Sequence, residues 1–248
     1  MYQKMGIKVT PNYSPNFNLK KRLKKKIKFI IIHYTGMKTE SAAIQKLQNP
    51  KEKVSSHFYI KKNGNALVLV PELYEAWHAG VSNWKKYRSL NKYSIGIEIT
   101  NPGHQYGYKN YSSKQIHTLK KLLNYLMKKY QINKKCILGH SDISPNRKKD
   151  PGEKFPWHLL AKNKLSWWHG LDLKKTKKFR KIKLFSQIEK NRFFKNLNKI
   201  GYNNIKGLKR HINNKYLTIA FQRRFRQSVI DGKVDKECLL ISTNLASN

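Results

Sequence analysis

Two histidines and one aspartate have the residue types and positions needed to bind a single metal ion. His140 directly follows a short apolar run at residues 135–138, and such a run predicts a buried strand. Asp150 lies further along, in a polar loop that ends at a Pro-Gly pair. His33 ends a second apolar run at residues 27–32. The two predicted strands therefore each end in a histidine, and we expect these histidines to meet at one edge of a sheet.

Two imidazoles and a carboxylate are a donor set found in catalytic zinc sites, where three protein ligands leave one position open for water. Each of the three residues also has a purely structural explanation. A histidine after a strand is often only a core or loop residue, and an aspartate before Pro-Gly often only forms a turn. The residue types alone leave both interpretations open.

The elements predicted around these residues alternate between strands and amphipathic helices. Residues 113–130 give the clearest helix, because apolar side chains recur there at steps of three and four residues. Asn63-Gly64 separates two strand candidates and predicts a hairpin. The expected strands cover residues 27–34, 56–60, 66–70, 94–100 and 135–138, and a shorter helix covers residues 39–47. This order predicts an α/β fold with a mixed central sheet flanked by helices.

The C-terminal part of the chain differs in character. Residues 171–185 are polar and highly charged, which is typical of a linker. Residues 186–248 then contain three short patterned segments that predict a small three-helix domain, close to the lower size limit for independent folding. We therefore expect a catalytic domain at residues 1–170, a linker at 171–185 and a separate helical domain at 186–248.

The chain is strongly basic, with 53 Lys and Arg residues against 13 Asp and Glu residues and a formal net charge of +40. Such a charge favours polyanionic partners, whether wall polymers, membrane surfaces or nucleic acids. The lysines are spread along the chain without clustered arginines and interleaved aromatic residues, which instead indicates a bias of composition. No stretch has the length of a membrane span, and the two distant cysteines, Cys136 and Cys238, predict no disulfide framework.

Five ordered blocks of sequence carry a resemblance to a known family. They are Ile32-His33-Tyr34-Thr35, Val54-Ser55-Ser56-His57-Phe58-Tyr59, Ala76-Trp77-His78-Ala79-Gly80, Ser94-Ile95-Gly96-Ile97-Glu98 and the loop from His140 to Gly152. Together they resemble the zinc-dependent N-acetylmuramoyl-L-alanine amidases of the amidase-2 type, which are related to peptidoglycan recognition proteins. The likeness extends from about residue 9 to residue 160.

A second resemblance lies in the C-terminal part. The segments Ile200-Gly201-Tyr202, Ala220-Phe221-Gln222 and Asp231-Gly232 resemble those of a small helical domain that binds peptidoglycan. This likeness implies a wall-binding role for residues 186–248. A basic three-helix module without that role is the alternative.

The amidase resemblance implies an enzyme that hydrolyses the amide between N-acetylmuramic acid, or its anhydro form, and L-alanine of the stem peptide, in peptidoglycan turnover or recycling. One Zn²⁺ per chain would be held by His33, His140 and Asp150. Glu98, flanked by isoleucines on a predicted strand, is the expected general base, because desolvation raises the pKa of a carboxyl group into a useful range. By resemblance alone, Lys148 is expected to stabilise the oxyanion.

The remaining expectations concern substrate and partners. The resemblance implies substrate contacts from Tyr34, His57, Trp77 and His78. Peptidoglycan and its muropeptides are the expected partners, the chain is expected to be a monomer, and no specific nucleic acid is expected. The alternatives are a non-catalytic peptidoglycan-recognition protein and a basic nucleic-acid-binding protein. Residues 1–26 contain no apolar signal core, which predicts a cytoplasmic protein; a periplasmic location is the alternative if the natural N-terminus lies upstream.

Overall fold

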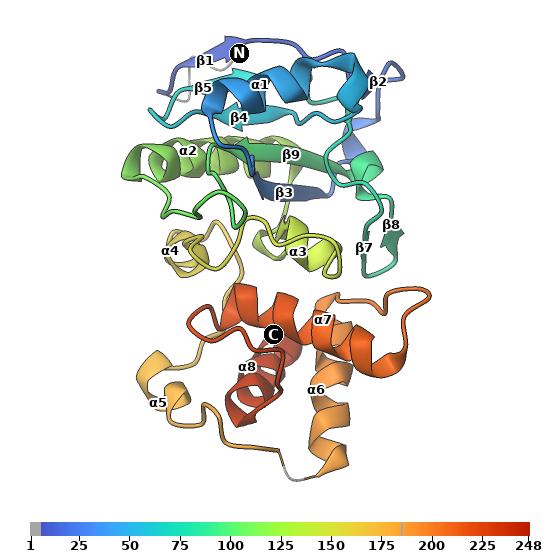
Figure 1. Cartoon of the computed structure of the whole chain (residues 1–248), viewed down its shortest axis with the longest axis vertical. Coiled ribbons are helices and arrows are strands. Elements are labelled where there is room, and N and C mark those ends of the chain that lie inside the picture. The colour runs from blue at the N-terminus through green and yellow to red at the C-terminus, as the bar shows by residue number, and fades with distance from the viewer. Residues whose placement is uncertain (1–5, 185) are drawn as a thin grey trace.

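The computed structural model describes residues 6–184 and 186–248. Figure 1 shows two regions: a sheet with helices α1 and α2 beside it, and a cluster formed by helices α6, α7 and α8. Helices α3 and α4 lie between the two regions (Figure 1). We refer to residues 186–248, which contain α6 to α8, as the tail.

The central sheet has six strands in the order β1-β5-β4-β9-β3-β10. The pair β4–β5 is antiparallel, whereas β1–β5, β4–β9, β9–β3 and β3–β10 are parallel. These strands are β1 (Val9–Pro11), β3 (Phe29–Tyr34), β4 (Phe58–Ile60), β5 (Ala66–Val68), β9 (Ser94–Ile99) and β10 (Ile137–Gly139). Two small two-stranded sheets are formed by β2 (Phe17–Asn18) with β6 (Glu75–Ala76) and by β7 (Asn83–Trp84) with β8 (Tyr87–Arg88). The predicted mixed sheet is confirmed.

The α-helices agree with most of the sequence patterns. They are α1 (Glu40–Gln48), α2 (Ser113–Tyr130), α3 (His140–Ile143), α4 (Trp157–Lys162), α5 (Leu173–Lys177), α6 (Gln187–Ile200), α7 (Arg210–Phe225) and α8 (Lys236–Ser247). Helix α2 has the predicted bounds, and a capping box between Ser112 and Gln115 satisfies its first N–H groups. The three helices expected in the tail are present as α6, α7 and α8. The sequence patterns do not predict helices α3, α4 and α5.

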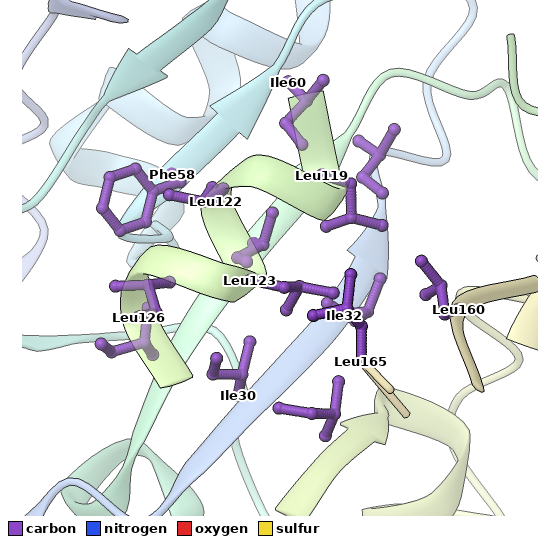
Figure 2. Packing of buried hydrophobic residues seen from close by; sticks show 14 of the residues in the cluster. Ile30, Ile32, Phe58, Ile60, Leu119, Leu122, Leu123, Leu126, Leu160 and Leu165 are labelled. Atoms are coloured by element: carbon purple, nitrogen blue, oxygen red, sulfur yellow. The ribbon is translucent and has the colours of Figure 1, made fainter. Parts of the chain in front are cut away.

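Alternating side chains divide the sheet into two buried faces. On one face, Ile30, Ile32 and Phe58 pack with the apolar stripe of α2, which Figure 2 shows with Leu119, Leu122, Leu123 and Leu126 pointing at the strands. The central strands are covered on both sides, which explains their continuous apolar runs.

The opposite face has two parts. Tyr59 packs with Ala43 and Leu47 of α1, whereas Phe29 and Ile31 join a cluster that includes side chains of α6, α7 and α8. The tail thus shares a hydrophobic core with β3 and β10. The charged segment expected as a linker contains α5, which packs against α8. The division of the chain into independent domains stays a prediction.

The lengths and the apolar character of the helices decide whether one of them could cross a membrane. Among the described residues, every helix is too short or too polar to cross a membrane.

Candidate metal centre

Three potential ligand atoms converge on one point beside the sheet. His33 lies on β3, His140 begins α3 directly after β10, and Asp150 follows in the next loop. The Nδ1 atoms of the two histidines are 3.0 Å apart, and Asp150 Oδ2 lies 2.9 Å from His33 Nδ1 and 3.1 Å from His140 Nδ1. All three side chains are buried. Strands β3 and β10 are adjacent and parallel, so their ends lie together, as the sequence predicted.

A chain of hydrogen bonds behind His33 fixes which of its ring nitrogens carries the proton. The Ser94 hydroxyl lies 2.6 Å from the Leu90 carbonyl oxygen, and because a carbonyl only accepts, the hydroxyl donates there. His78 Nε2, 3.2 Å from Ser94 Oγ, must then donate to that oxygen, which leaves Nδ1 of a neutral His78 as an acceptor. His33 Nε2 lies 3.0 Å from this acceptor and donates to it. His33 Nδ1 therefore faces Asp150 with a free lone pair.

Burial keeps these rings neutral. Desolvation, together with the neighbouring His140, lowers the pKa of His33 to about 4. Desolvation and the adjacent His33 lower the pKa of His78 well below its ordinary value. Both imidazoles are therefore in the neutral form at neutral pH, and for His33 this is the form that metal coordination requires.

His140 is oriented in a similar way. Its Nε2 atom lies 3.1 Å from the carbonyl oxygen of Ala79, which can only accept, so Nε2 carries a proton and donates, and Nδ1 is the ring atom that faces His33 and Asp150. The Nδ1 atoms of both histidines are thus directed at the same point.

A backbone hydrogen bond positions the third ligand. The N–H of Ser141 donates to the carbonyl oxygen of Asp150 over 2.9 Å, which ties the start of α3 to the end of the polar loop. Although burial alone would raise the pKa of Asp150, its contacts with His140 and His33 hold that pKa well below its usual range. The carboxylate is therefore ionised.

The resulting donor set fits a metal cation. The Nδ1 atoms of His33 and His140 and a carboxylate oxygen of Asp150 lie 2.9–3.1 Å from one another. When both rings carry their proton on Nε2, no proton lies between the three atoms, and the arrangement is repulsive unless a cation takes that place. Ligand atoms about 2.0–2.1 Å from a tetrahedral zinc ion are about 3.3 Å apart, which is close to these separations. The group His33, His140 and Asp150 can thus hold a metal ion.

Glu98 lies next to this group. On the parallel pair β3–β9 it is in register with His33, so both side chains are on the same face of the sheet. It is only 9% exposed, and its Oε2 atom has no hydrogen-bond partner among the described residues. Burial, and then the charge of Asp150, raise the pKa of Glu98 to about 8, whereas Lys148 acts in the opposite direction. The site therefore contains a carboxyl group that can exchange a proton near neutral pH.

A pocket of about 530 Å³ opens onto these residues. Its lining includes the three ligands and four further residues of interest: His33, His140 and Asp150, with Tyr34, His78, Glu98 and Lys148. Burial raises the pKa of Tyr34 to about 12, so its hydroxyl stays protonated. Lys148 is half-buried, whereas its neighbour Arg147 is exposed and donates to the Val81 carbonyl oxygen over 2.6 Å.

Two of the expected substrate contacts lie elsewhere. His57 is fully buried; its Nδ1 accepts from the Gly96 N–H over 2.9 Å, and its Nε2 lies 3.0 Å from the Tyr74 carbonyl oxygen. Trp77 donates from Nε1 to Asn18 and does not line the pocket. The structure thus brings Tyr34 and His78, but not His57 and Trp77, together with the ligands. All four roles in substrate binding stay predictions.

Sequence reasoning misses the residues that support His33. The apolar pattern indicates Ser94 only as part of a strand, and it gives Gly96 no role. A Cβ atom at Gly96 would lie 2.5 Å from Cγ of His78, so only glycine leaves room for that ring. The available signal was a glycine within an otherwise apolar strand, which often marks a close approach of another group.

Three converging side chains that could hold a metal ion, an ionisable carboxyl group and an open pocket form a site whose chemistry suits a hydrolase. Residues 23–153 match the family Amidase_2, N-acetylmuramoyl-L-alanine amidase, and the chain belongs to this family. The family expected from the five sequence blocks, and with it the expected class of enzyme, is confirmed.

Individual relatives extend this result. The chain is 30% identical to the N-acetylmuramoyl-L-alanine amidase AmiD of Escherichia coli, over 89% of this chain and 82% of that protein. It is 42% identical to the 1,6-anhydro-N-acetylmuramyl-L-alanine amidase AmpD of Haemophilus influenzae, but over only 42% of this chain and 55% of that protein.

Solved structures agree. The complex of AmiD with the substrate anhydro-N-acetylmuramic acid-L-Ala-D-gamma-Glu-L-Lys has a TM-score of 0.77 and 30% identity, covering 90% of this chain and 89% of that chain. AmpDH3 from Pseudomonas aeruginosa, in complex with anhydromuramic pentapeptide, has a TM-score of 0.77 and 28% identity, covering 94% and 96%. Coverage this high includes part of the tail in both comparisons.

Proposed function

We propose that this chain is a zinc-dependent amidase that hydrolyses the amide between N-acetylmuramic acid, or its anhydro form, and L-alanine of the stem peptide. The observation that carries the proposal is the convergence of three potential metal-ligand atoms, from His33, His140 and Asp150, beside a buried glutamate. Membership of the amidase family and the molecules bound in the related solved structures support the choice of substrate.

The chain's own residues supply the proton transfers. When bound, zinc would activate a water molecule and polarise the scissile carbonyl group. Glu98 then accepts the proton of the attacking water and delivers it to the nitrogen of the departing L-alanine. In the metal-free protein burial raises the pKa of Glu98 above that of an ordinary carboxyl group, so the carboxylate is a stronger base than an exposed glutamate and can also release the proton again.

Positive charge and pocket walls complete the proposed site. Lys148 lines the pocket, and its ammonium group is the donor that would stabilise negative charge developing on the carbonyl oxygen. Tyr34 and His78 also line the pocket. We assign Tyr34 to substrate contact, whereas His78 is engaged with His33 and orients that ligand.

A non-catalytic recognition protein would be expected to lack part of this machinery. Here all three ligand positions and Glu98 are present and buried, which favours an enzyme. Wall binding by the tail, a monomeric state and the lack of a specific nucleic-acid partner stay predictions.

Mass spectrometry of a defined muropeptide tests the proposal. Zinc-loaded protein is incubated with anhydro-N-acetylmuramic acid-L-Ala-D-gamma-Glu-L-Lys, and we expect the free sugar acid and the intact tripeptide, with one water added across the bond. The variant Glu98→Gln should bind zinc but release neither product at a comparable rate. An uncleaved substrate with fully zinc-loaded wild-type protein, or cleavage of a peptide bond instead, would contradict the proposal.

A further inference from the structure

The C-terminal end of helix α7 lies against the part of the chain that carries two of the three ligands. In Figure 1, α7 is the tail helix that faces α3 across the boundary between the two regions. Contacts between α3 and α7 join residues that are about 80 positions apart in the sequence. Two groups of polar contacts join the tail to the segment that carries His140 and Asp150.

The first group centres on Asp142, in the helix that begins with His140. Asp142 Oδ2 accepts the Gly139 N–H over 2.8 Å and therefore holds the first turn of α3. The same atom accepts Arg224 Nη1 over 2.5 Å, and Asp142 Oδ1 accepts the Tyr202 hydroxyl over 2.6 Å. Arg224 Nη2 also donates to the carbonyl oxygen of Ile137, on β10, over 2.8 Å.

These groups are removed from solvent. Asp142 and Arg224 are each 2% exposed and Tyr202 is 1% exposed. The Arg224 guanidinium also lies 4.1 Å from the centre of the Trp157 ring. A buried carboxylate that loses its partner is left with an uncompensated charge, so Asp142 depends strongly on Arg224.

The second group reaches the loop after Asp150. Gln227, just past the end of α7, donates from Nε2 to the carbonyl oxygens of Glu153 and Phe155, each over 2.7 Å. Arg223 Nε lies 3.7 Å from Glu153 Oε2. Residues 223–227 of the tail thus contact the ligand-bearing segment on both sides of its two ligands.

We propose that Arg224, Tyr202 and Gln227 are positioning residues for the metal site. Arg224 and Tyr202 act on His140 through Asp142, and Gln227 acts on Asp150 through the backbone that follows it. The tail is then required for tight metal binding, in addition to any affinity for the wall. This inference rests on the metal site of the proposed function, but it concerns metal affinity and can be tested without turnover.

The chain offers a matched control for Arg224. Arg226 is also a buried arginine, 3% exposed, and it forms ion pairs with Asp235 and Asp231. Its ion-pair partners among the described residues all belong to the tail. Replacing either arginine by methionine breaks a buried ion pair, but only Arg224→Met leaves Asp142 without its arginine partner.

The experiment measures zinc affinity in full-length proteins by competition with a chromophoric chelator, together with the visible spectrum of the cobalt-substituted site. Supporting contacts of metal ligands typically change affinity by about 10–100-fold, and we expect that loss for Arg224→Met, with an altered cobalt spectrum. Arg226→Met should stay within about threefold of the wild type, and Arg224→Lys should recover part of the loss, because a lysine retains the charge but not both hydrogen bonds. Circular dichroism checks that each variant is folded at the temperature used.

Milder variants keep the proposal testable if Arg224→Met does not fold. Tyr202→Phe removes the hydrogen bond to Asp142, and Gln227→Ala removes the hydrogen bonds to the Glu153 and Phe155 carbonyl oxygens. Each variant should weaken zinc binding severalfold. Wild-type affinity and an unchanged spectrum in the folded variants would overturn the proposal, as would an equal loss in Arg226→Met. Zinc binding by the wild type without amide cleavage would instead refute the proposed function and leave this inference intact.

Discussion

Replacing Glu98 by glutamine should stabilise the metal-free protein, and the same change should remove the activity of the zinc-loaded enzyme. The folded structure raises the pKa of Glu98 from 4.5 to about 8, mainly through burial. The neutral form is therefore favoured on folding: its stabilising effect is fully present below pH 4.5 and is lost as the pH rises towards 8. Glutamine is neutral at every pH, so the stability of Glu98→Gln should not fall in this way as the pH rises.

The magnitude follows from the same pKa values. Each unit of pKa difference corresponds to about 1.4 kcal/mol. At pH 8 the raised pKa of Glu98 therefore lowers the free energy of unfolding by on the order of 4 kcal/mol, relative to a side chain that is always neutral. A buried glutamine amide without hydrogen-bond partners is itself destabilising, so we expect the free energy of unfolding of Glu98→Gln to exceed that of the wild type by only about 1–3 kcal/mol. For a chain of this size each kcal/mol raises Tm by about 2–4 °C.

Thermal unfolding of chelator-treated wild type and Glu98→Gln at pH 8 and pH 5 measures this effect. We expect a clearly higher Tm for the variant at pH 8 and a much smaller difference at pH 5. Glu52→Gln is the control, because Glu52 is exposed and its surface ion pair with Lys46 contributes little. Equal Tm values at pH 8, or a larger gain at pH 5, would refute the reasoning about burial. In the zinc-loaded enzyme the same variant should lose about 10²–10⁴-fold in kcat.

Three further predictions concern the site. Asp150→Ala should lose both bound zinc and activity, as measured by metal analysis of the purified protein and by muropeptide cleavage; retained stoichiometric zinc would argue against this ligand. Lys148→Ala should bind zinc normally but lower kcat by about 10²-fold in steady-state assays, and an unchanged kcat would exclude a role at the oxyanion. His78→Phe should weaken zinc binding by about 10–100-fold in chelator competition, because His33 loses the acceptor that fixes its tautomer; wild-type affinity would contradict the hydrogen-bond chain.

Local patterns in the sequence predicted much of the architecture. The apolar stripe of α2 defined that helix, and Asn63-Gly64 lies between the antiparallel strands β4 and β5, as expected. The positions of His33 and His140 at the ends of apolar runs predicted that two strands would bring them together, because parallel neighbours end at the same sheet edge.

Contacts between distant residues could not be predicted in this way. His78 lies 45 positions from His33, and Arg224 lies 82 positions from Asp142. No local pattern marks either pair, because the two residues are brought together only by the tertiary fold. Helix α3 is also missed by the sequence patterns, because its four residues are too few to show a helical period.

In the tail, too, the helices could be predicted from the sequence but the contacts between distant residues could not. Its three helices follow from their apolar spacing, whereas the two buried contacts of Asp142 with Tyr202 and Arg224 do not. The polar, charged segment before the tail is typical of a tethered module. The shared hydrophobic core shows why composition alone does not reveal how closely two parts of a chain pack.

The most direct test of the central claim is a titration of the metal-free protein with zinc, monitored by cleavage of anhydro-N-acetylmuramic acid-L-Ala-D-gamma-Glu-L-Lys. The three-ligand site at His33, His140 and Asp150 predicts that release of the tripeptide increases with zinc and reaches a plateau at one equivalent per chain. Full activity before zinc is added, or no cleavage of the amide with the site fully loaded, would contradict the account.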